Sequence, residues 1–324
     1  MIMQELEGAT GIDARALVTF RPEMRDAREK LQWASKRITT YEEDIAYSLF
    51  GIFGIHLPVL YGEKKQKALG RLLQEIVAHS GDITALNWVG KSSEFNSCLP
   101  ADITSYRALP CTLPSLSEDE MQTSVSSLQN ALVVELPSKL YSLLESLSAP
   151  RFANSRLHLP CIAFLVTEIR RRHDGDQKTY FTYDVKADGL EDLLVTTAER
   201  LTQFSRARPT RQTFLFVRPW DRHDLGLLDF ADDAQSVEDC SEPGSPLDDL
   251  LDESLGENEP VDLESPSREL RLIVRLGQPF CALLLAQQPV GEYKRIASDH
   301  DIIAQVKNME SVHDMMDVRT LEIL

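Results

Sequence analysis

Residues 37–63 read RITTYEEDIAYSLFGIFGIHLPVLYGE and concentrate several folding signals in one short stretch. Thr40 stands three residues before Glu43, which is the spacing of a capping box at a helix N-terminus. Two glycines weaken the helix that follows, and Pro58 prevents its continuation. Apolar side chains recur at helical spacing and predict one buried stripe: Ile45, Ala46, Leu49, Phe50 and Phe53. The stretch therefore predicts a capped, half-buried helix with an abrupt end.

The segments on both sides also have helical patterns. RPEMRDAREKLQWASKR (21–37) places Pro22 in the first turn, where a helix tolerates proline. In KKQKALGRLLQEIVAHS (64–80) the apolar residues again repeat with helical period: Ala68, Leu69, Leu72, Leu73, Ile76 and Val77. The first eighty residues therefore predict a helical hairpin.

Beyond Gly81 the chain changes to short segments with the pattern of β-strands. TYFTYDV (179–185) alternates, and RELRLIVRL (268–276) alternates more clearly, with leucine and valine on one side and arginine on the other. KLYSLLESL (139–147) and EDLLVTTAERLTQF (191–204) are the helix candidates in this part. Further strands are predicted at CIAFLVTEI (161–169), QTFLFVR (212–218), CALLLAQ (281–287), EYKRIAS (292–298) and VRTLEIL (318–324).

These patterns predict an α+β fold of two parts. Few helical segments separate the strands, which favours antiparallel pairing over βαβ units. We expect an N-terminal helical hairpin (1–80) packed on a mainly antiparallel β-sandwich or barrel-like domain (81–324). Residues 229–266 are rich in Asp, Glu, Ser and Pro, and they cannot bury enough apolar surface to offset the entropy of ordering. They predict an acidic disordered insert within the second part.

The charge of the chain is concentrated in that insert. The formal net charge is −17, but residues 229–264 hold 14 of the 51 acidic residues and no Lys or Arg. Without them 37 acidic residues face 34 basic ones, a net charge of −3. The longest basic run is RRRH at 170–173, and a short run of this kind is usually a solvated surface. We therefore expect no nucleic-acid partner.

The cysteines and the N-terminus indicate the compartment. The N-terminal residues lack the basic and then apolar layout of a signal peptide, and no apolar run approaches the roughly 20 residues of a membrane helix. The five cysteines are scattered without a CxxC pair: Cys98, Cys111, Cys161, Cys240 and Cys281. This distribution argues against a disulfide framework and a zinc site, and it fits a reducing compartment. We expect a cytoplasmic protein that does not enter membranes.

Candidate chemistry is sparse. ALNWVGKS (85–92) matches a permissive phosphate-loop pattern, but its centre is bulky, and we interpret it as a strand that leaves the core through a polar turn. Asp299-His300-Asp301 is interpreted as a solvated turn. The histidines show no HxxxH or HExxH spacing, and no G-x-S-x-G elbow occurs. We predict no catalytic, cofactor-binding or metal-ligating residue, although a triad assembled only in space stays open.

One stretch carries a family resemblance. WASKRITTYEEDIAYSLFGIFGIHLPVLYGE (33–63) resembles the C-terminal end of the fungal heterokaryon incompatibility (HET) domain, with its WA-x-R-x-TT-x-x-ED-x-AYSLLGIF motif and its LYGEG turn. Lys64 departs from this pattern, where the family has glycine. The later β-rich part resembles the region that follows this domain in basidiomycete proteins. The matching residues, which we interpret as structural, are Trp33, Arg37, Thr39, Thr40, Glu43, Asp44, Tyr47, Leu49, Gly51, Phe53, Pro58, Tyr61, Gly62 and Glu63.

The resemblance implies a function. It suggests a non-enzymatic interaction or regulatory protein with a protein partner, related to non-self recognition that leads to cell death. Family members carry an upstream α/β part that has no counterpart here, so we expect a truncated relative or a gene-model fragment. The family fold has been compared with the Toll/interleukin-receptor type, some members of which cleave NAD. The alternatives are therefore a NAD-cleaving or nucleotide-hydrolysing enzyme remnant, and an inactive fragment of a larger HET-domain protein.

Overall fold

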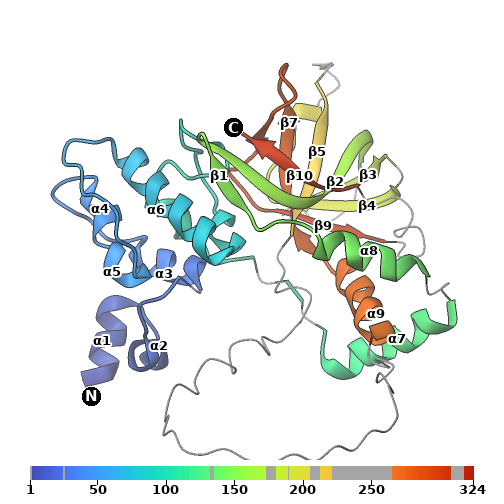
Figure 1. The fold of residues 1–324 in the computed structure, drawn as a ribbon, viewed down its shortest axis with the longest axis horizontal. Helices are drawn as coiled ribbons and strands as arrows, with labels where there is room; N and C mark the ends of the chain where they lie inside the picture. Colours follow the sequence, from blue (N-terminus) through green and yellow to red (C-terminus); the bar gives the residue numbers. More distant parts are fainter. Residues whose placement is uncertain are drawn as a thin grey trace, which may run out of the picture.

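The computed structural model has helices at its N-terminus and a ten-stranded sheet beyond them (Figure 1). This is the α+β class that the sequence predicts, although the strands do not form a simple barrel. Most of the predicted acidic insert, residues 229–264, lies outside the described residues, and helix α9 begins at Ser265. The structure describes residues 2–24, 26–111, 113–114, 116–131, 135–172, 180–188, 190–204, 212–220, 265–307 and 317–324.

The N-terminal part buries the stripes that the sequence predicts. All six apolar positions predicted in the segment 64–80 are buried on the longest helix, α6. Gly81, with φ of 68°, ends α6 in the left-handed conformation that glycine adopts without a steric penalty. The helices of this part are α1 (Ile2–Thr10), α2 (Ala14–Thr19), α3 (Ala27–Ala34), α4 (Asp44–Tyr47), α5 (Phe50–Phe53) and α6 (Lys65–Ser80).

The prediction of a helix after Thr40 is wrong in two details. It divides into the single turns α4 and α5, although Ala46, Leu49 and Phe53 are buried as predicted. The capping box does not form, because Thr40 is exposed and makes no cap hydrogen bond. The Glu43 carboxylate instead accepts the N–H of Gly62 at 2.8 Å, and this bond holds the pKa of Glu43 below its ordinary value. A contact distant in sequence has therefore replaced the local cap.

Thr40→Ala is consequently expected to change the free energy of unfolding by no more than about 0.5 kcal/mol, as exposed substitutions usually do. Glu43→Gln is expected to destabilise the fold more, because it weakens the acceptor of the Gly62 N–H. Urea denaturation of both variants measures the difference. A loss of about 1 kcal/mol in Thr40→Ala, the usual cost of a lost cap, would contradict this assignment.

The sheet is antiparallel except where β10 pairs with β8 through Ile323 and Tyr293. Its strand order is β10-β8-β7-β5-β2-β3-β4-β9-β6, with β1 against β2 and a further pairing of β10 with β2. The strands are β1 (Arg151–Ala153), β2 (Arg156–Arg171), β3 (Phe181–Ala187), β4 (Leu190–Thr197), β5 (Phe214–Pro219), β6 (Phe280–Cys281), β7 (Leu283–Gln287), β8 (Tyr293–Ile296), β9 (Ile302–Val306) and β10 (Asp317–Ile323).

The long strand β2 joins the two halves of this sheet. We call them the first sheet (β1, β2, β5, β7, β8 and β10) and the second sheet (β2, β3, β4, β6 and β9). Its first half pairs with β10 and β5, and its second half pairs with β3, with a register shift between Val166 and Glu168. Strands β5 and β7 of the first sheet are buried on both faces, so their alternate residues enter different hydrophobic clusters. In β5, Leu215 and Val217 pack toward the N-terminal helices, whereas Phe214 and Phe216 face the second sheet.

The first cluster is shared by the two predicted parts of the chain. It joins Leu31, Leu49 and Leu72 of the helices with Leu285 and Leu321 of the sheet. In Figure 1 helices α1–α6 accordingly lie on one side of the sheet. The division between 1–80 and 81–324 stays a prediction, since one continuous core crosses it.

On the other side lie α7 (Glu118–Ala131), α8 (Glu135–Glu145) and α9 (Ser265–Leu276) (Figure 1). Helix α8 confirms the prediction for 139–147. The strand predicted at 268–276 is wrong, because this segment forms most of α9. Its alternation also fits a helix: Leu272, Ile273 and Leu276 enter the second cluster, while Leu270 and Val274 contact α7.

The helix candidate 191–204 is also wrong. It contains β4 and the short 3₁₀ helix η3 (Thr202–Phe204). Leu193 and Val195 of β4 are buried, and β3 and β9 supply partners for its backbone on both sides. In the part of the chain that the structure describes, no helix combines the length and the apolar composition that crossing a membrane requires.

Candidate functional site

The family-motif residues meet around the turn 58–63. The Tyr47 hydroxyl donates to Glu63 Oε1 at 2.6 Å and accepts the Leu60 N–H at 3.1 Å. Arg71 of α6 forms an ion pair with the same Glu63 oxygen and donates to the Pro58 carbonyl at 2.9 Å. Burial and the hydrogen bond to Glu63 raise the pKa of Tyr47. These side chains fasten the turn to α4 and α6.

Other motif residues lie outside this network. Trp33 is half-buried beside Phe20, and the Thr39 hydroxyl donates to the Tyr41 carbonyl at 2.5 Å. Arg37 is exposed and lines a shallow pocket with Thr39, and the backbone of Gly51 is exposed. Asp44 begins α4, Leu49 and Phe53 are core residues, and the Gly62 N–H holds Glu43.

Apolar side chains next to this network face the solvent. Tyr61 is 74% exposed and Tyr41 is 60% exposed, and their rings meet edge to face with centroids 6.2 Å apart. Three apolar side chains near these tyrosines in sequence are also exposed: Ile38, Val59 and Leu60. We call these five residues the aromatic surface. The resemblance identified the residues that build the turn, but only the fold shows which of their neighbours face solvent.

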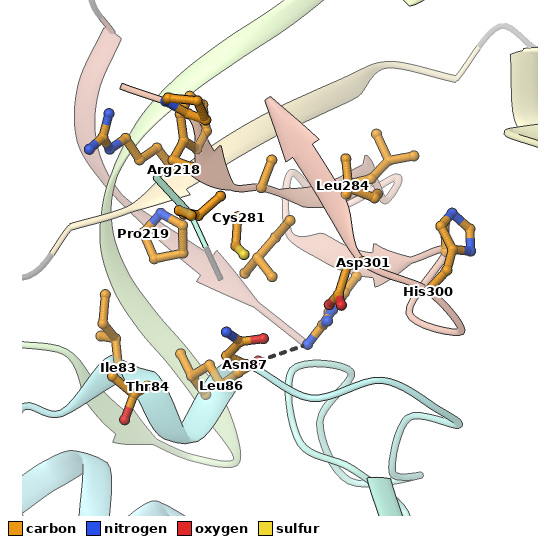
Figure 2. Close-up of a pocket in the computed structure, with 18 residues that line it drawn as sticks. Ile83, Thr84, Leu86, Asn87, Arg218, Pro219, Cys281, Leu284, His300 and Asp301 are labelled. Carbon is orange, nitrogen blue, oxygen red and sulfur yellow. Dashed lines mark hydrogen bonds between the residues drawn. The ribbon is translucent and has the colours of Figure 1, made fainter. Parts of the chain in front are cut away.

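A pocket of about 260 Å³ lies where the N-terminal part meets the sheet. Figure 2 shows its walls: Leu86 ends the 3₁₀ helix η1 (Ile83–Leu86) and Asn87 follows it, Pro219 ends β5, Cys281 belongs to β6, and Asp301 precedes β9. We call it the η1 pocket. Burial raises the pKa of the Cys281 thiol, so this group is a poor nucleophile near neutral pH.

Arg295 of β8 lines the η1 pocket. Its guanidinium donates to the carbonyls of Leu86 and Trp88, both at 3.1 Å, and lies 4.2 Å above the Trp88 ring. The Trp88 indole N–H donates to the Cys98 carbonyl at 2.8 Å. Burial lowers the pKa of Arg295. This arrangement joins the sheet to the segment after η1.

That segment contains the phosphate-loop pattern at 85–92. It forms the end of η1 and an irregular stretch, and the helix that a phosphate loop needs does not follow. The alternative interpretation as a strand is wrong too. The carbonyls of Leu86 and Trp88 accept hydrogen bonds from the Arg295 guanidinium, whereas in a strand they would accept backbone N–H groups of a neighbouring strand.

The interpretation of Asp299-His300-Asp301 as a solvated turn is also wrong. Asp299 is exposed, but His300 is buried, Asp301 is half-buried, and both line the η1 pocket. The connection is held by Ser298, whose carbonyl accepts the Gly90 N–H at 2.7 Å. No local signal in the sequence indicates this contact across the fold. Among the described residues, no three His, Cys, Asp or Glu side chains are grouped to hold a metal ion.

Comparison with known proteins adds one similarity. An 81-residue stretch, 25% of this chain, is 43% identical to the vegetative incompatibility protein HET-E-1 of Podospora anserina. The chain covers 6% of that protein, so it spans only a small part of the relative's length. No family model matches the chain, and no solved structure matches it. The similarity confirms the coarse part of the resemblance: the chain is similar, over a quarter of its length, to a heterokaryon incompatibility protein.

Proposed function

We propose that this chain is a non-enzymatic interaction module of fungal heterokaryon incompatibility, and that it binds a protein partner through the aromatic surface. The similarity to HET-E-1 supports the biological setting. The observation that carries the proposal is the exposed Tyr41–Tyr61 pair, whose Tyr61 lies on the turn that Tyr47, Glu63 and Arg71 hold in place. Binding of the partner leads to the growth arrest associated with incompatibility.

The physical properties of this surface suit binding. Tyrosine offers a large contact area at a small cost in conformational entropy, and aromatic residues are enriched in protein interfaces. Large apolar side chains that are exposed together mark sites of protein–protein interaction. The internal hydrogen bonds hold the turn in place before binding, so little ordering entropy is lost when a partner docks.

The test is expression in fungal cells with growth as the readout. The parent chain is expected to arrest growth, and the double variant Tyr41→Ser/Tyr61→Ser is expected to lose the arrest while keeping its melting temperature. Tyr180→Ser is the matched control, because Tyr180 is 57% exposed and lies next to β3, outside the aromatic surface. Growth arrest that persists in the double variant would contradict binding of the partner through the aromatic surface. A parent chain without any effect would contradict the proposed function.

The non-enzymatic part has its own test. Purified protein is incubated with NAD and with nucleoside triphosphates, and the products are separated by chromatography. We expect no turnover. Turnover that a single substitution abolishes would instead establish the enzyme alternative.

A further inference from the structure

We propose that the η1 pocket binds a small neutral molecule that carries a carboxamide-type head group on an apolar body. The head group lies between Arg295 and Asp301. This inference concerns a different region from the aromatic surface and does not depend on it.

The first observation is a carboxylate without a partner. Asp301 is half-buried and lines the η1 pocket, yet it forms no hydrogen bond or ion pair with any described residue. Burial raises the pKa of Asp301, and the nearby charges of Arg295 and Arg28 offset this effect only in part. The Asp301 carboxylate oxygens are therefore open to accept an N–H from a ligand in the pocket.

The second observation is the spare hydrogen-bonding capacity of Arg295. A guanidinium has five N–H donors, and the bonds to Leu86 and Trp88 use two of them. None of the others has an acceptor among the described residues. The pocket therefore offers a buried donor group and an acceptor group that do not satisfy each other. A carboxamide presents a carbonyl oxygen and an N–H side by side, which matches both.

The charges facing the pocket favour a neutral head group. Arg218 and Arg295 are cationic and Asp301 is anionic, so either sign of charge on a ligand meets a like charge. Arg218 also donates to the carbonyl of Leu276 at 2.9 Å, at the C-terminus of α9. His300 is only 8% exposed, and its Nε2 has no hydrogen-bond partner among the described residues, so it is a second unsatisfied group in the wall.

Much of the remaining wall is apolar, although Thr84 and Asn87 also line it. Leu86, Pro219, Phe280, Leu283 and Ile302 line the pocket. Its volume of about 260 Å³ limits the occupant to a small molecule rather than a peptide. An apolar body with few polar atoms would be buried against these side chains while its head group contacts Asp301.

Three compounds with one ring and different head groups test the proposal. Benzamide, benzoate and benzylamine are titrated against the full chain, and binding is measured by ligand-observed NMR. Benzamide is expected to bind most tightly, by several-fold over either charged compound. Asp301→Ala is expected to weaken benzamide binding about tenfold, as the loss of a hydrogen bond to a charged group does.

Asp192→Ala is the matched control, since this exposed aspartate belongs to β4 and does not line the pocket. It is expected to leave benzamide binding unchanged. Melting temperatures establish that both variants fold; if Asp301→Ala unfolds, Asp301→Asn, which keeps an acceptor oxygen, is expected to show a smaller loss. Tighter binding of benzoate or benzylamine, no binding of benzamide, or an equal affinity in the Asp301 and Asp192 variants would overturn the proposal.

Discussion

Trp88→Ala is expected to lower the free energy of unfolding by about 3–5 kcal/mol, the usual cost of removing a buried tryptophan. The Trp88 side chain is fully buried in the cluster that joins the helices to the sheet. Its removal leaves a cavity beneath the Arg295 guanidinium, which loses its stacking partner at 4.2 Å. The Cys98 carbonyl also loses its donor, the Trp88 indole N–H.

Urea denaturation followed by both fluorescence and circular dichroism measures this effect. Trp33→Ala is the matched control, because Trp33 is only half-buried, and the expected loss is less than half as large. An equal loss of unfolding free energy in the two variants would show that Trp88 contributes no more to stability than a half-buried tryptophan does. If Trp88→Ala does not fold, Trp88→Phe keeps most of the packing and isolates the lost hydrogen bond.

Leu49→Ala is expected to cost about 2–5 kcal/mol. Leu49 lies between the single-turn helices α4 and α5 and has no exposed surface. Neither helix has enough internal hydrogen bonds to be stable alone, so buried side chains hold this segment in place. The same truncation at Leu60, which is 47% exposed, is expected to cost about 1 kcal/mol or less.

Chemical denaturation of the Leu49 and Leu60 variants makes this comparison within a single motif. A Leu49→Ala protein as stable as the parent would show that the apolar stripe of residues 45–53 is not part of the core. The two predictions also differ in location: Leu49 packs within the helical part, whereas Trp88 lies where that part meets the sheet. Both belong to one cluster, so the stability of their double variant measures whether the two sites are coupled.

Local periodicity was sufficient where a segment has one buried side and no competing partner. Helix α6 is an example, because its apolar residues recur every three or four positions and a glycine ends it. The strands β2 and β5 were predicted because a run of apolar residues four to nine long suits a strand buried on both faces. The polar network of Tyr47 and Glu63 could not be read from spacing, and only the family resemblance singled out its residues.

Periodicity failed where two periods fitted the same residues. The segment 268–276 satisfies both a strand and a helix, and the contacts of α9 with α7 and α8 decide for the helix. The segment 191–204 has the composition of a helix in part, but open backbone groups on β3 and β9 pair with it as β4. In each case a partner distant in sequence satisfies more backbone and apolar surface than the local preference does.

The sequence by itself determined the α+β class, the helical N-terminus, most strands and the similarity to incompatibility proteins, because these depend on the order of residues along short segments. The tertiary structure alone decided the η1 pocket. Its walls come from segments that are far apart in sequence: 83–84, 86–87, 113, 218–219, 279–284, 295, 297 and 300–302. It also decided that Asp301 is half-buried and that Arg295 meets the Trp88 ring. Burial and charge depend on all the chain that surrounds a group, and no local pattern contains that information.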